Sequence, residues 1–206
     1  MCGIAGLIHR GKSSNVGSEL QQMLQALKHR GPDSTGYALY AENEGKNFIM
    51  RFKVGENVGE GSSSVNEDES VYDERKKLVD NKLSELGATI VKEEQLTPYS
   101  YRYEIKYDKD LMDFSKKIES VEMVEILSIG KSLELIKDLG DAKTVSERYS
   151  LDKVKGTHGI GHARMATESG VDIKSAHPFW GYPFADVSVV HNGQLTNYWN
   201  NRSCLL

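Results

Sequence analysis

Several features are scarce in this 206-residue sequence, and each scarcity excludes a class of protein. The two cysteines, Cys2 and Cys204, are too few for the disulfide framework of a small secreted domain. The six histidines show none of the spacings typical of metal sites, so neither a metal nor another cofactor is expected. No apolar run reaches the length of about 18 residues that a membrane helix needs, so no membrane association is expected.

The charge is close to balanced, with 26 basic and 30 acidic residues and a net charge of -4. This balance gives no general attraction to nucleic acid, and no nucleic-acid partner is expected. The N-terminus lacks the long apolar core of a signal peptide, which predicts a cytoplasmic protein whose cysteines stay reduced. The length suits one large domain or two small ones.

The first residues carry the strongest chemical signal. Removal of Met1, which aminopeptidases perform when a small residue follows, would expose Cys2 with both a thiol and a free α-amino group. The α-amino group titrates near pH 7.7–8.0, so a large fraction of it is neutral at physiological pH and can accept the thiol proton. One residue could therefore supply both the nucleophile and its base. A buried cysteine that acts only as a small apolar side chain is the alternative.

The opening and closing parts of the chain have a similar texture. Strands are predicted over 2–9, 37–40, 47–54 and 187–191, with a helix over 18–28 capped by Ser18. The stretch 156–167 reads as a strand that enters a polar loop, and Asn192-Gly193 is a turn pair. Taken alone, that pair indicates a hairpin, and an arginine such as Arg164 indicates a surface charge.

Between these parts, residues 55–70 have the composition of a linker, and a different pattern follows. Helices are predicted over 71–86, over 109–119 with Asp108 as cap, and over 131–139; strands are predicted over 88–93, 99–107 and 121–129. Residues 141–155 read as a polar connection. The order of elements resembles half or more of a ferredoxin-like module over 71–140. The tyrosines of the second strand could suggest an RNA-binding sheet, but no basic patch accompanies them, and core packing is favoured.

Five short motifs resemble those of class II glutamine amidotransferases, the N-terminal-nucleophile family, and they occur in that family's order. They are CGIAG at 2–6, HRGPDSTG at 29–36, GHARMAT at 161–167, AHP at 176–178 and HNGQLTN at 191–197. The nearest likeness is to glutamate-synthase-type amidotransferase subunits that carry an insertion. The resemblance implies an α+β fold, a four-layer αββα sandwich formed by 1–54 and 156–206, with the α/β module inserted.

The resemblance also implies the chemistry: hydrolysis of glutamine to glutamate through a thioester on Cys2, with ammonia delivered to a partner synthase. Asn192 and Gly193 would form the oxyanion hole. Substrate-binding roles would fall to Arg164 for the α-carboxylate, Thr167 beside it, and Arg30 as a positioning residue. His177 is expected to be structural. The protein could also form an oligomer.

Two departures from the family pattern stand out. Glu168 occupies a position where several relatives carry histidine. The family also continues past the Asn-Gly motif and supplies an acidic residue for the substrate α-amino group, whereas this sequence ends at Leu206. We therefore expect an incomplete sandwich, or one that another chain completes.

Two rival functions remain at this stage. The domain could serve an amino-sugar, purine or asparagine synthase instead of a glutamate synthase. The chain could also be a non-catalytic regulatory protein that binds a ligand or partner through the inserted module. Reactivity of Cys2 toward a glutamine-mimicking electrophile distinguishes an enzyme from a regulator.

Overall fold

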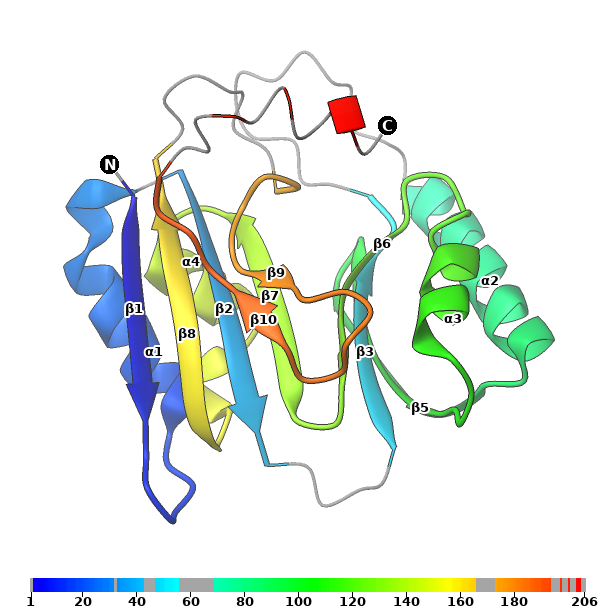
Figure 1. The fold of residues 1–206 in the computed structure, drawn as a ribbon, viewed down its shortest axis with the longest axis horizontal. Helices are drawn as coiled ribbons and strands as arrows, with labels where there is room; N and C mark the ends of the chain where they lie inside the picture. Colours follow the sequence, from blue (N-terminus) through cyan, green and yellow to red (C-terminus); the bar gives the residue numbers. More distant parts are fainter. Residues whose placement is uncertain are drawn as a thin grey trace.

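Two four-stranded antiparallel sheets, with helices packed on them, form most of the computed structural model (Figure 1). The structure describes residues 2–31, 33–42, 47–55, 69–165 and 173–193, together with positions 197, 200, 203 and 204. Thr167, Glu168 and most of the expected linker at 55–70 lie outside these residues. None of the helices in the described part is long and apolar enough to cross a membrane.

The first sheet joins segments from both ends of the chain. Its strand order is β1-β8-β2-β7, with β1 at Gly3–Ile8, β8 at Gly156–Arg164, β2 at Ser34–Ala41 and β7 at Leu133–Leu139. Two helices pack on one face of it, α1 at Val16–Ala26 and α4 at Ala142–Arg148. Short 3-10 turns follow each helix, η1 at Lys28–Arg30 and η2 at Leu151–Lys153.

Helix α1 packs on the sheet through Val16, Leu20 and Leu24, which have no exposed surface. Their spacing of four residues places them on one side of the helix, and Leu20 and Leu24 belong to the apolar set that predicted this element. The cap position is Asn15, not the expected Ser18. Helix α1 therefore begins one turn earlier than the sequence indicated.

The second sheet has the order β4-β5-β3-β6 and is built almost entirely from the middle of the chain. Its strands are β3 at Phe48–Lys53, β4 at Thr89–Thr97, β5 at Ser100–Lys106 and β6 at Glu125–Gly130. Helices α2 at Glu69–Leu86 and α3 at Leu111–Ile118 cover its outer face (Figure 1). Tyr101 and Tyr103 lie inside this apolar core, as the packing interpretation of the tyrosine stripe predicted.

Three expectations about the middle of the chain are wrong. The predicted helix at 131–139 is instead a turn followed by strand β7 at 133–139, and the polar connection at 141–155 contains α4 and η2. Helix α3 is capped by Asp110, whose carboxylate accepts the Asp113 N–H at 2.8 Å, instead of by Asp108. Strand β7 escaped prediction because all its residues are buried, so no polar face marks the period of two.

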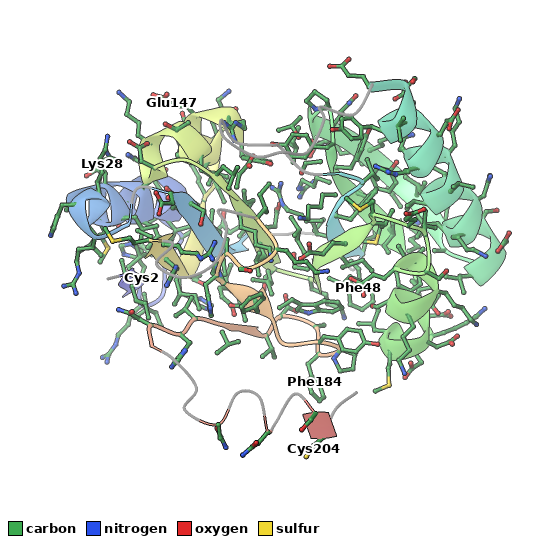
Figure 2. The ribbon with its side chains drawn as sticks, turned by 90° about the horizontal axis from the view of Figure 1, so that it is seen from above. Cys2, Lys28, Phe48, Glu147, Phe184 and Cys204 are labelled. Atoms are coloured by element: carbon green, nitrogen blue, oxygen red, sulfur yellow. The ribbon has the colours of Figure 1, made fainter. Side chains whose placement is uncertain are left out.

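Strand β3 is part of the second sheet. It was grouped with the opening strands, but it pairs with β5 and β6. The short turn between β6 and β7 then leads back to the first sheet, where β7 pairs with β2. Seen from above in Figure 2, α1 and α4 lie at one end of the molecule, α2 and α3 at the other, and the sheets lie between them.

Buried ion pairs connect the two sheets. Glu134 of β7 accepts hydrogen bonds from Arg51 of β3, with Nε at 2.8 Å, and from Arg102 of β5, with Nε at 2.8 Å. Burial alone would raise the pKa of Glu134, but the two guanidinium groups lower it to about 2. The carboxylate is therefore ionised at neutral pH and stabilises the contact between the sheets.

Replacing Glu134 with glutamine should destabilise the protein by about 3–5 kcal/mol at pH 7, because the buried Arg51 guanidinium loses its carboxylate partner and the half-buried Arg102 keeps only Glu94. The folded-state pKa lies below the ordinary value of 4.5, so this contribution is present above pH 4.5 and is lost as the pH falls toward 2. Urea unfolding at pH 7 and pH 3 should therefore show a smaller deficit at pH 3. Glu85→Gln, at an exposed pair with Lys82, is the matched control and should change little.

A loop from Phe179 to Val189 lies across the other face of the first sheet (Figure 1). Its two short strands, β9 at Phe179–Trp180 and β10 at Ser188–Val189, pair with each other. The Asp186 carboxylate accepts the backbone N–H groups of Lys131, Ser132 and Leu133 at 2.8–3.1 Å. This side chain therefore fixes the loop to the turn between β6 and β7.

Candidate active site

One edge of the first sheet gathers the start of β1, the end of β8 and the start of β2. Gly3 pairs with Ala163, and Ser34 pairs with Arg164. Cys2 therefore lies beside Arg164, one residue beyond the paired ends of β1 and β8. Its side chain is half-buried, with Sγ 3.9 Å from the Met165 carbonyl oxygen. Figure 2 places Cys2 on the α1 side of the molecule, far from Phe48 of β3.

Asn192 meets Cys2 at this edge. The Asn192 side-chain Nδ2 donates to the carbonyl oxygen of Cys2 at 2.9 Å, which joins residues 190 positions apart. Gly193 follows directly, so its N–H is carried on the same exposed segment. The structure thus brings Asn192 into contact with Cys2, and Gly193 is the next residue along the chain.

Arg164 is the cation nearest to this group in the strand register. Only 7% of its surface is exposed, although a guanidinium is strongly solvated when free. Its backbone carbonyl accepts the Asp33 N–H at 3.1 Å, which ties the end of β8 to the loop before β2. A planar guanidinium suits bidentate binding of a carboxylate.

Arg30 lies on η1, directly behind β8. A Cβ atom at the next residue, Gly31, would lie 2.4 Å from the Ala163 carbonyl oxygen, so only glycine allows η1 to approach this closely. The Arg30 side chain is half-buried. The structure therefore places Arg30 near the strand end that carries Arg164. Thr167, the other predicted substrate contact, lies outside the described residues.

Three histidines form a cluster beside these residues. His162 of β8 is almost fully buried, and its ring lies 4.9 Å from the ring of His177, centroid to centroid. The Nδ1 atom of His177 accepts the backbone N–H of His191 at 3.2 Å. No group of three or more histidine, cysteine or acidic side chains within the described ranges has the geometry of a metal site.

His162 and His177 are both neutral at physiological pH. Burial, followed by repulsion from His177 and Arg164, lowers the pKa of His162 to about 4. Burial, followed by repulsion from His191, Lys137 and Arg164, lowers the pKa of His177 to about 4. The site therefore combines two neutral imidazoles with a largely buried guanidinium.

Lys137 is a neighbour of this cluster that sequence reasoning missed. Its ammonium group lies 4.8 Å from the ring centroid of Phe179 and 3.1 Å from Oε1 of Glu125. It was missed because residues 131–139 were predicted as a helix, which would not direct residue 137 to the site. Only the strand register, in which Lys137 pairs with Gly36, reveals its position.

Comparison with known proteins finds relatives that match the whole length of this chain. No protein-family model matches the chain. A protein of Methanothermobacter thermautotrophicus that is provisionally named a glutamine amidotransferase is 38% identical over 210 residues, covering 100% of this chain and 65% of its own length. The glutamine amidotransferase-like protein GlxB of Rhizobium meliloti is 31% identical over 209 residues, covering 100% of this chain and 63% of its own length.

The chain is similar over its whole length to proteins named as glutamine amidotransferases. It spans less than two thirds of the length of these relatives. A shorter match is to amidophosphoribosyltransferase 1 of Arabidopsis thaliana, 37% identical over 76 residues, which covers 36% of this chain and 13% of that protein. The similarity supports the resemblance to glutamine amidotransferases in general, which the five motifs had indicated.

Proposed function

We propose that this chain is the glutaminase part of a class II, N-terminal-nucleophile glutamine amidotransferase. The observation that carries the proposal is the 2.9 Å contact between the Asn192 amide and the Cys2 carbonyl. This contact joins the motif at 2–6 to the motif at 191–197, from opposite ends of the sequence, at the residue that carries the thiol. The similarity to whole-chain relatives named for this activity supports the same assignment.

The proposed reaction begins after removal of Met1. The neutral α-amino group of Cys2 takes the thiol proton, and the thiolate attacks the side-chain amide carbon of glutamine. The N–H groups of Asn192 and Gly193 stabilise the resulting oxyanion. The protonated α-amino group then gives its proton to the leaving nitrogen, so ammonia departs and a thioester remains. Water, deprotonated by the same amine, releases glutamate and restores the thiol.

Substrate recognition is assigned to residues at the same edge of the sheet. Arg164 binds the α-carboxylate of glutamine, since it is a largely buried guanidinium beside Cys2. Arg30 positions this part of β8 through η1, and Thr167 is proposed as a companion hydroxyl on the motif of the resemblance. No cofactor takes part in these steps.

The ammonia would pass to a partner synthase. A glutamate-synthase-like acceptor is proposed from the motif resemblance. The alternative acceptors are an amino-sugar, purine or asparagine synthase, and a relative in Arabidopsis is named an amidophosphoribosyltransferase. The identity of a co-purifying synthase subunit would decide between them.

For the fold, we propose that the first sheet with α1 and α4 is part of an N-terminal-nucleophile αββα sandwich. The second sheet with α2 and α3 is proposed as the inserted ferredoxin-like module. Its elements follow the order β3-α2-β4-β5-α3-β6, so we place its bounds at β3 and β6 instead of at 71–140. Strand β7 then belongs with the amidotransferase part, because it pairs with β2.

The test is hydrolysis of glutamine by the purified chain, with loss of Met1 confirmed by intact mass. Ammonia and glutamate should appear in equal amounts, and glutamine α-amide, which lacks the carboxylate for Arg164, should be a much poorer substrate. Absence of turnover from the processed chain would contradict the catalytic proposal and favour the regulatory alternative. Equal turnover of both amides would contradict the role of Arg164.

A further inference from the structure

The backbone of His177 packs directly against strand β2 of the first sheet. A Cβ atom at Gly36 of β2 would lie 2.0 Å from the His177 carbonyl oxygen and 2.8 Å from Cδ of Pro178. The backbone of His177 can therefore lie on β2 only because residue 36 has no side chain. Gly36 pairs with His162 on one side and with Lys137 on the other, so His177 is seated between these two side chains.

From this position, the His177 ring reaches the segment that carries the proposed oxyanion hole. Its Nδ1 atom accepts the backbone N–H of His191 at 3.2 Å. His191 directly precedes Asn192, and Asn192 in turn donates to the carbonyl of Cys2 at 2.9 Å. A continuous series of contacts therefore runs from the middle of the sheet to the nucleophile.

We propose that His177 is a positioning residue, whose imidazole holds the backbone at His191 and so directs Asn192 and Gly193 toward the carbonyl carbon under attack. The inference rests on the proposed glutaminase function. It assigns a role in catalysis to a residue that sequence analysis expected to be structural. His177 does not touch the substrate in this account, and its effect passes through the His191 backbone.

The charges around His177 suit this role, because Nδ1 accepts a hydrogen bond only while it carries no proton. The groups that face the ring are His162 and Arg164 of β8, Lys137 of β7 and His191 of the held segment. Glu125, the carboxylate near Lys137, is bound to that lysine and to Lys53. The surroundings therefore disfavour protonation, and the contact should persist from neutral pH down to about pH 4.

Two substitutions separate the acceptor from the bulk of the ring. In His177→Asn, the amide oxygen can occupy the place of Nδ1 and accept the same N–H; His177→Leu fills the space without an acceptor. We expect His177→Leu to lower kcat for glutamine about 10- to 100-fold with KM changed less than about 3-fold, because the displaced donors act on the transition state. His177→Asn should recover most of this loss.

His158→Leu is the matched control. His158 lies on β8, like His162, but it stacks on Tyr40 at a ring-centroid distance of 3.9 Å, away from Cys2. Its kcat should stay close to that of the wild type. Thermal midpoints of all three variants report whether each is folded. Equal losses in His177→Leu and His177→Asn, or a loss confined to KM, would overturn the positioning role.

A second measurement tests the contact without any turnover. In the wild type, the backbone amide resonance of His191 should shift with a midpoint near pH 4, and the shift should be absent in His177→Leu. An unchanged titration in His177→Leu would overturn the inference even where glutaminase activity is found. A wild type that does not hydrolyse glutamine but shows the expected titration would overturn the proposed function and leave the contact established.

Discussion

Cys2→Ala is expected to lower the rate of ammonia release from glutamine by at least about 1,000-fold. The thiol forms the bond to the amide carbon, and alanine keeps the α-amino base but supplies no nucleophile. The rate is measured as ammonia and glutamate formed by the processed chain. Because alanine is also a small residue, removal of Met1 from this variant should proceed as in the wild type and is confirmed by mass.

Cys204→Ala is the matched control for this substitution. Cys204 is the second cysteine of the chain and is exposed, whereas Cys2 is half-buried. The control should retain the wild-type rate. Activity that survives in Cys2→Ala, or that disappears in Cys204→Ala, would contradict the assignment of the nucleophile.

Asn192→Ala is expected to lower kcat about 100- to 1,000-fold, equivalent to about 2.7–4 kcal/mol, with little change in KM for glutamine. The side-chain amide lies beside Cys2, at 2.9 Å from its carbonyl oxygen, where an N–H can reach the oxyanion of the tetrahedral intermediate. Steady-state kinetics at saturating glutamine measure the effect. Most of the loss should appear in kcat, because the charge on that oxygen develops only in the transition state.

Asn192→Asp tests whether the donor or the volume of this side chain matters. It keeps the shape but replaces the N–H donor with an anionic acceptor, so it should be at least as impaired as the alanine variant. Asn47→Ala, which removes a 2.6 Å contact to Glu104 on the second sheet, should leave kcat unchanged. A rise in KM alone in Asn192→Ala would show that the residue binds the ground state instead.

Much of the secondary structure followed from local pattern. The helical spacing of Leu20, Met23, Leu24 and Leu27 indicated α1, in which Leu20 and Leu24 are buried. The alternation of Tyr101, Tyr103 and Ile105, all buried, indicated β5. Strand β7 did not follow, because it is buried on both faces and carries Glu134, Lys137 and Asp138 inside the molecule. Charged side chains that pair across sheets obscure the pattern on which such predictions depend.

The residues of the candidate site that belong to the motifs could be predicted from the sequence. Cys2 and Asn192 were predicted to act together, and the structure brings them into contact. The positions of Lys137 and His177 were not predictable, because they depend on the pairing of Gly36 with β7 and β8. Register between strands far apart in sequence is set by tertiary packing, and one chain without its fold does not reveal it.

The most direct test of the central claim is covalent labelling of the processed chain with a glutamine-mimicking electrophile, followed by intact-mass analysis and peptide mapping. The account predicts a single adduct on the thiol of Cys2, in a chain that begins at that residue, and protection from labelling by excess glutamine. An adduct on Cys204, labelling that glutamine does not slow, or no adduct at all would contradict the claim that Cys2 is the nucleophile of a glutaminase.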